Sequence, residues 1–232
     1  MTEKVFLDIG AHTGETLAIA RDARWGFTQI HSFEPAQNCW PNLNATREQD
    51  QRVTVHPVGL WDQPGHLCLH GAGTIGGSFF DRGNADTALV ETVDTSTYLN
   101  KILPDGAAII GKVNVEGAEL EVLRGLQRLL ETRRDLSLDG LLVHVDADKL
   151  IGHERRAHAA RAIIRSLPNA SADHAAFFGP TVQAKTRNWL RHVLGSSAQR
   201  TQLQAIERPA HALRVAAWHL KQRTRIKQVT HG

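Results

Sequence analysis

An acid and two glycines near the start of the chain have the types and spacing of a binding loop for a polar ligand. The apolar run Val5–Ile9 contains Asp8, and Gly10 and Gly14 frame the short loop that follows it. An apolar run that ends in glycine is typical of a buried parallel strand, and residues 16–21 are expected to begin a helix. The loop and the helix N-terminus would form a cradle for a ligand, because glycine lets the backbone approach closely. The alternative is a tight turn without a ligand, since Gly-x-x-x-Gly alone is a weak signal.

A second acid follows at the distance of one strand–helix–strand unit. Glu34 ends the short run that begins at Ile30, lies 20 residues after Gly14 and precedes Pro35, which has no amide hydrogen and ends the strand. The spacing predicts Glu34 at the tip of the strand beside the first loop, where a carboxylate can accept hydrogen bonds from both hydroxyls of a ribose. The alternative is a surface acid at a strand end.

Neither loop matches the common phosphate-binding patterns. A P-loop needs a lysine after its second glycine, where this chain has Glu15, and a dinucleotide fingerprint needs glycines at its first, third and sixth positions. Acids at Asp8 and Glu15 would repel a pyrophosphate. They suit a ligand with a cationic centre and an amino group, such as S-adenosylmethionine.

Polar residues also follow two later apolar runs. In the run from Ala108, Lys112, Asn114 and Glu116 alternate, so we expect all three on one side of a central strand. His144 and Asp146 share a face at the end of the run from Leu141, which predicts a fifth strand, Leu141–Asp146. Open α/β sheets bind ligands outside the carboxyl ends of their strands. His144 is therefore a candidate general base or metal ligand, or else a histidine that is simply hydrogen-bonded in a strand end.

A third loop is expected on the same edge. The strand Arg52–Val58 precedes Gly59–Asp62, which would place Gly59, Leu60 and Trp61 near the base of a bound cofactor. Trp61 would stack on adenine or pack on the core. The other expected elements, in chain order, are a helix at Asn38–Arg47, an edge strand at His66–His70, a lid or linker at Gly71–Ser78, a strand at Glu91–Asp94, a helix near Tyr98 capped by Asp94, Thr95 or Ser96, helices at Ala118–Leu130 and Glu154–Leu167, a possible strand at Ala175–Pro180, and helices at Arg187–Leu194 and Ala205–Arg225.

Length and composition indicate one globular domain. The chain has 232 residues, with 41% hydrophobic and 22% charged side chains. We expect a single domain over residues 1–232, with a core at about 4–167 and a helical, basic extension at about 184–232. The net charge of +3 is only mildly basic, and much of the excess lies in a C-terminal cluster that is most simply a solvated tail: Lys221, Arg223, Arg225 and Lys227.

Cysteine usage and hydropathy favour a protein of the reducing cytoplasm. Cys39 and Cys68 have neither metal-ligand spacing nor a disulfide framework, and the histidines are scattered, so no structural zinc is expected. No run reaches the roughly 18 apolar residues that a membrane span needs, and the N-terminus lacks a signal-peptide pattern.

Four blocks of the chain together resemble the FkbM-type S-adenosylmethionine-dependent methyltransferases. They lie at residues 5–14, 32–35, 91–95 and 112–125, and the resemblance covers roughly residues 4–146. The last block is the specific one, because Lys-x-Asp-x-Glu-Gly-x-Glu followed by Val-Leu and Gly is typical of that family. The first two blocks are shared with most Rossmann-like methyltransferases.

The resemblance implies an α/β fold with a mostly parallel, seven-stranded Rossmann-like sheet, helices on both faces, and O-methylation of sugars or natural products. It implies that Asp8, Gly10 and Gly14 cradle the amino-acid portion of S-adenosylmethionine, that Glu34 binds its ribose, and that the block from Lys112 to Glu119 lies near the reacting methyl. The candidate cofactor-binding residues are Asp8, Gly10, Ala11, His12, Thr13, Gly14, Glu34, Pro35, Gly59, Leu60 and Trp61; the candidate catalytic residues are Lys112, Asn114, Glu116, His144 and Asp146; no residue is assigned to a metal.

One departure from the family pattern leaves three functions in competition. Asn114 stands where the family usually has aspartate, and an amide is neither an anionic base nor a good ligand for a divalent metal. The leading prediction is methyl transfer to a hydroxyl of a small-molecule or glycan acceptor, with His144, Asp146 or Glu116 as the base. The second is a cofactor-binding protein with reduced turnover, and the third is a nucleic-acid methyltransferase, which the lack of an Asn-Pro-Pro-Tyr-like motif disfavours. The sequence leaves the acceptor and the oligomeric state open.

Overall fold

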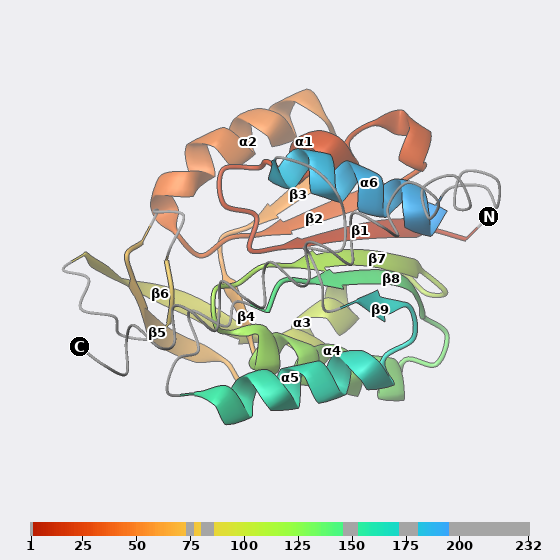
Figure 1. Ribbon diagram of the computed structural model, residues 1–232. Helices are drawn as coiled ribbons and strands as arrows, with labels where there is room; N and C mark the ends of the chain where they lie inside the picture. Colours follow the sequence, from red (N-terminus) through yellow and green to blue (C-terminus); the bar gives the residue numbers. More distant parts are fainter. Residues whose placement is uncertain (1, 73–76, 80–85, 146–152, 172–180, 195–232) are drawn as a thin grey trace. The chain divides into compact units, whose positions relative to one another are not determined.

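The computed structural model describes residues 2–72, 77–79, 86–145, 153–171 and 181–194 (Figure 1). The chain divides into two compact units, Met1–Ala172 and Asp173–Gly232. The second contains α6 (Val182–Leu194), which begins earlier than the expected helix Arg187–Leu194. The strand expected at Ala175–Pro180 and the helix expected at Ala205–Arg225 lie outside the described residues. The single domain with a C-terminal extension stays a prediction.

The first unit is built on a parallel six-stranded sheet. Its strand order is β3-β2-β1-β7-β8-β9, and each neighbouring pair is parallel. The expected α/β class and mostly parallel sheet are therefore confirmed, with six strands in this sheet among the described residues rather than the seven expected. The strands are β1 (Lys4–Ile9), β2 (Gln29–Phe33), β3 (Val53–His56), β7 (Ala108–Val113), β8 (Ser137–Val143) and β9 (Ala170–Ser171).

Helices cover both faces of this sheet. From β1 the chain moves to β2 at one side, and from β7 it moves to β8 at the other, so right-handed crossovers place the intervening helices on opposite faces. Figure 1 shows α3, α4 and α5 packed side by side, apart from α1 and α2. The helical segments of this unit are α1 (Leu17–Ala20), a 3-10 turn at Ala23–Trp25, a 3-10 turn at Gln37–Cys39, α2 (Trp40–Gln49), α3 (Thr95–Ile102), α4 (Glu119–Thr132) and α5 (Glu154–Ser166).

The central strands and α4 form the main core. All six residues of β7 are buried, as expected for a central strand with helices on both faces. The apolar stripe predicted for Ala118–Leu130 is the buried side of α4, where Val122, Leu126 and Leu129 are at most 2% exposed. α4 lies so close to the start of α3 that a Cβ on Gly125 would come within 2.3 Å of the Thr95 Cβ.

A second, three-stranded sheet corrects the predicted third loop. β4 (Gly59–Trp61) pairs in parallel with β6 (Thr87–Asp94), and β5 (Gly65–His70) pairs antiparallel on the other side of β6. The prediction that Gly59–Asp62 forms a loop is wrong for its first three residues. Their backbone pairs with β6, a partner that lies farther along the chain and leaves no local pattern in the sequence.

Two strand ends also differ from the predictions. β8 ends at Val143 rather than Asp146, so His144 lies one residue beyond the strand and Asp146 lies outside the described residues. β7 ends at Val113, and the expected alternation through Glu116 fails because Glu116 has a left-handed backbone with φ of 53°.

In the part of the chain that the structure describes, no helix combines the length and apolarity needed to cross a bilayer.

Candidate functional site

The candidate site begins with the loop that follows β1. Gly10 has φ of 77°, and a Cβ built on it would come within 2.0 Å of the carbonyl oxygen of Asn114. The backbone N–H of Asn114 in turn donates a hydrogen bond to the carbonyl of Ile9. Only glycine fits at position 10, because both the left-handed backbone and the close approach exclude a side chain. The loops after β1 and β7 are therefore in direct contact.

The Glu34 carboxylate binds the backbone of this loop. Its Oε2 accepts a hydrogen bond from the His12 amide at 2.7 Å, and its Oε1 accepts one from the Ala36 amide at 3.0 Å. Burial raises the pKa of Glu34, although the two amides and Lys112 oppose that rise. Each carboxylate oxygen can accept a second hydrogen bond, so Glu34 keeps acceptor capacity beside the loop.

Polar contacts within the loop involve His12, Thr13 and Glu15. The Glu15 Oε1 lies 3.1 Å from His12 Nδ1 and accepts a hydrogen bond from Thr13 Oγ1 at 2.9 Å. Burial alone would raise the pKa of Glu15, but hydrogen bonds from its own backbone, His12 and Thr13 outweigh burial and lower it. Because its pKa is lowered, Glu15 stays anionic beside the loop.

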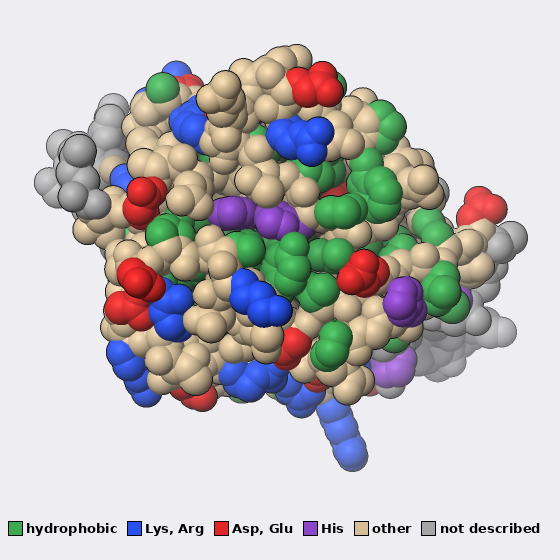
Figure 2. All heavy atoms as spheres, turned by 180° about the vertical axis from the view of Figure 1, so that it is seen from behind, with side chains coloured by type: hydrophobic (Ala, Val, Ile, Leu, Met, Phe, Trp, Pro, Cys, Tyr) green, Lys and Arg blue, Asp and Glu red, His purple; other side chains and the backbone are tan. Residues whose placement is uncertain are grey.

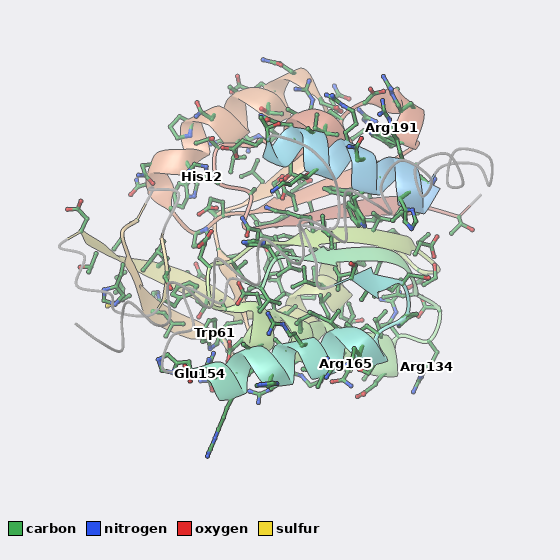
Figure 3. The ribbon with its side chains drawn as sticks, in the orientation of Figure 1. His12, Trp61, Arg134, Glu154, Arg165 and Arg191 are labelled. Atoms are coloured by element: carbon green, nitrogen blue, oxygen red, sulfur yellow. The ribbon has the colours of Figure 1, made fainter. Side chains whose placement is uncertain are left out.

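Figure 3 shows His12 and Trp61 on the side of the sheet where the parallel strands end.

A buried ion pair lies beneath the loop. Asp8 and Lys112 are register partners on β1 and β7, and Lys112 Nζ lies 3.2 Å from Asp8 Oδ1. The Lys112 ammonium also donates to the Gly10 carbonyl at 2.6 Å. Burial raises the pKa of Asp8, and Lys112 opposes that rise. Because Lys112 is only 3% exposed, the structure places it under the loop.

The block after β7 is held by contacts at both ends of one peptide unit. The carbonyl of Glu116 accepts a hydrogen bond from Ser78 Oγ at 2.7 Å, and the amide of Gly117 donates to Glu119 Oε1 at 3.0 Å. Ser78 is itself paired with the backbone of His70 in both directions. Nearby, the buried Oδ1 of Asn114 has no hydrogen-bond partner among the described residues.

The sequence suggested a lid or linker at Gly71–Ser78 but did not single out Ser78. It ends the glycine-dense segment Gly71–Ser78, whose only sequence signal is its composition. No spacing rule connects it to a loop 38 residues later.

The remaining predicted residues are placed as follows. The His144 amide continues the β7–β8 ladder by donating to the Val113 carbonyl at 2.8 Å, and its side chain is half-buried. Leu60 is 3% exposed in the main core. The Trp61 ring packs edge-on against Phe79, with ring centroids 5.2 Å apart. The contacts of Gly59, Leu60 and Trp61 are thus those of a strand and its packing.

The charges around the loop fit a cationic ligand. The structure brings Asp8, Glu15 and Glu34 to one strand-end region, and Lys112 compensates only one of these acids by a direct ion pair. Asp8 Oδ2 is a second buried acceptor without a partner among the described residues. Carboxylates without a matching cation and unpartnered acceptor atoms suit a ligand with an ammonium, a sulfonium and ribose hydroxyls. Within the described ranges, no group of three metal-ligating side chains converges.

Comparisons with known proteins give a family model and a solved structure that match part of the chain. The family model of the methyltransferase FkbM domain matches residues 8–138. The chain is also similar to the crystal structure of methyltransferase FkbM from Methylobacillus flagellatus KT, at 21% sequence identity and a TM-score of 0.41. That similarity covers 57% of this chain, which spans about a third (31%) of the solved chain. No curated protein matches the chain.

Proposed function

Because the chain belongs to the FkbM methyltransferase family, we propose that it transfers a methyl group from S-adenosylmethionine to a hydroxyl of a sugar or natural-product acceptor. The observation that supports the donor site most strongly is the Glu34 carboxylate, which binds the His12 and Ala36 amides and keeps acceptor capacity at the end of β2. The acceptor class rests on the family resemblance alone.

The residues of the strand-end loops have the chemistry to hold this donor. Glu34 would accept hydrogen bonds from the ribose hydroxyls, and Asp8 and Glu15 would stabilise the cationic groups. Gly10 and Gly14 keep side chains out of the loop. When bound, S-adenosylmethionine supplies an electrophilic methyl group on a sulfonium. The chain must then align the acceptor oxygen and remove its proton.

The base for that proton is proposed to be His144, with Glu116 as the competing candidate. His144 follows β8 and Glu116 follows the neighbouring β7, so both backbones leave the sheet at its carboxyl edge. Asn114 cannot take a proton as an anionic base. The Lys112 ammonium donates hydrogen bonds to the Asp8 carboxylate and the Gly10 carbonyl, so it is not assigned as the base.

A cofactor-binding protein with reduced turnover is the second candidate. Asn114 is the observation that favours it, because the family pattern has an aspartate there. The two candidates share the donor site and differ only in turnover. An acceptor screen in which the protein binds donor but methylates nothing would favour the second.

The donor site is tested by calorimetry with S-adenosylhomocysteine. Glu34→Ala is expected to weaken binding by roughly 1–3 kcal/mol, because it leaves buried polar groups of the ligand and the loop without their hydrogen-bond partner. Glu48→Ala, on the exposed side of α2, is the matched control and should bind like the wild type. Unchanged affinity in a folded Glu34→Ala protein would refute the ribose assignment.

The base is tested by the pH dependence of turnover on an acceptor found by screening. His144→Ala is expected to lower kcat by roughly 10²–10⁴ and to leave donor affinity nearly unchanged. The wild-type rate should rise with pH through the imidazole range, because only neutral imidazole accepts a proton. If His144→Ala kept this pH limb and Glu116→Gln lost it, Glu116 would be the base.

A further inference from the structure

The peptide unit between Gly10 and Ala11 is held at both ends by neighbouring strands. Its carbonyl oxygen accepts a hydrogen bond from Lys112 Nζ on β7 at 2.6 Å. Its N–H, the amide of Ala11, donates to the carbonyl of Phe33 on β2 at 3.0 Å. The loop after β1 is therefore fixed between the two strands that flank β1.

The orientation of this peptide depends on outside contacts, because glycine does not restrict its own backbone dihedral angles. Gly10 has φ of 77°, and a residue without a Cβ has low-energy conformations on both sides of φ = 0. A change at Gly10 would turn the Gly10–Ala11 peptide and move the His12 amide away from Glu34 Oε2, which it now contacts at 2.7 Å. The geometry of the loop therefore depends on contacts from outside it.

The Lys112 side chain is built to reach this carbonyl. Its backbone is in register with Asp8, two residues before Gly10, so its stem runs along the sheet toward the carboxyl edge. Its ammonium is buried and meets the Asp8 carboxylate and the Gly10 carbonyl together. An ammonium this deeply buried is stable only with partners such as these, and Asp8 supplies its countercharge.

We propose that Lys112 is a positioning residue, whose ammonium fixes the Gly10–Ala11 peptide and thereby presents the loop after β1 to the methyl donor. Lys112 takes no proton from the acceptor in this role. The effect on the donor rests on the proposed function, whereas the effect on the loop does not.

Two variants separate positioning from charge compensation. Lys112→Met alone leaves Asp8 as an uncompensated buried acid, so its instability would be uninformative. Asp8→Asn alone would likewise leave Lys112 as an uncompensated buried ammonium. Asp8→Asn/Lys112→Met removes both charges and the N–H donor to the Gly10 carbonyl, whereas Asp8→Asn/Lys112→Gln removes both charges and keeps an N–H donor on this side chain. We expect Asp8→Asn/Lys112→Met to bind S-adenosylhomocysteine at least about tenfold more weakly than Asp8→Asn/Lys112→Gln, because the buried Gly10 carbonyl loses its hydrogen bond. Equal affinity in these two variants would overturn the positioning role.

Hydrogen exchange of the ligand-free proteins provides a readout that does not depend on the donor. Amide exchange in the peptide that covers residues 9–14 should be at least about tenfold faster in Asp8→Asn/Lys112→Met than in Asp8→Asn/Lys112→Gln, whereas peptides from α4 should exchange alike. Equal exchange over residues 9–14 would also overturn the proposal. If the wild type failed to bind S-adenosylhomocysteine while the exchange difference appeared, the proposed function would fail and the positioning role would stand.

Discussion

Buried acids distinguish the candidate site at the level of single residues. Burial raises the pKa of both Asp8 and Glu34, although each has hydrogen-bond donors that oppose the rise. Of these two acids, only Asp8 is in direct ion-pair contact with Lys112. An excess of carboxylate in a poorly solvated region is costly, unless a cationic ligand or a proton joins it. The proposed donor carries such a charge.

Gly10 provides a residue-level test of the contact between the loops. Gly10→Ala is expected to lower the free energy of unfolding by about 2–4 kcal/mol, since the new Cβ meets the Asn114 carbonyl and the left-handed backbone is unfavourable. Gly106→Ala is the matched control, because Gly106 has φ of 69° with nothing within 4 Å of its notional Cβ. It should lose only about 1–2 kcal/mol. Equal losses in urea unfolding would mean that the contact is easily relaxed.

At the level of elements, β2, β3 and α3 are joined by a chain of hydrogen bonds that is buried between the two histidines and partly buried at the tyrosine. His31 Nδ1 lies 2.9 Å from His56 Nε2, and His56 Nδ1 lies 3.1 Å from the Tyr98 hydroxyl. The His56 ring also stacks on Phe33, with ring centroids 4.5 Å apart. Burial lowers the pKa of each histidine to about 4. The pair is therefore neutral near pH 7, and one imidazole donates while the other accepts.

This pair predicts a loss of stability in mild acid. An unfolded histidine titrates near pH 6.5, whereas the folded pair titrates near 4, so the unfolded chain binds more protons between these values. The stabilisation is complete above about pH 6.5 and is lost as the pH falls toward 4. Between pH 7 and pH 5, His56→Gln should lose about 2 kcal/mol less unfolding free energy than the wild type.

Urea unfolding of both proteins at the two pH values gives this difference directly. The raised pKa values of Asp8, Glu34 and Glu121 act in the opposite direction. They are present in both proteins and cancel in the comparison. Parallel losses in the two proteins would show that His56 does not titrate as a buried neutral group.

At the level of the whole molecule, the net charge is modest because two parts of the chain carry net charges of opposite sign. Residues 1–172 carry 17 basic and 22 acidic side chains, and residues 173–232 carry 10 basic and 2 acidic ones, so their net charges are −5 and +8. On the face shown in Figure 2, acidic and basic side chains are interspersed. The basic excess is therefore a property of the C-terminal sequence.

This division predicts retention on a polyanion. The full chain should bind heparin at pH 7 despite its net charge of +3, because local positive charge releases counterions from the polymer. Replacing Lys221, Arg223, Arg225 and Lys227 by glutamine should lower the salt concentration of elution. The matched control replaces Arg24, Arg47, Lys101 and Arg134 of the first unit, and it should elute at nearly the same salt concentration as the wild type. We expect no methyl transfer from S-adenosylmethionine to RNA or DNA. Incorporation of the methyl group into either nucleic acid would instead support a nucleic-acid methyltransferase.

The sequence by itself determined the features that depend on short spacings. Strand periodicity and glycine placed the loop between Gly10 and Gly14, the strand that ends beside Glu34, and helix α4, because these patterns repeat over one or two turns or strands. The resemblance to the family rested on four local blocks, of which the one at residues 112–125 is the specific one.

Only the tertiary structure decided which side chains meet. Lys112 and Asp8 are 104 residues apart in the chain, and Ser78 and Glu116 are 38 apart. Their contacts follow from the order of the strands and from pairings such as β4 with β6, and many pairings fit the same local patterns. The prediction that Lys112 lies beside the reacting methyl drew on the family motif, whereas its burial under the loop follows from the register of β1 and β7. Register depends on the buried faces of both partner strands, so the hydrophobic pattern of one run does not fix which residue of another run it meets.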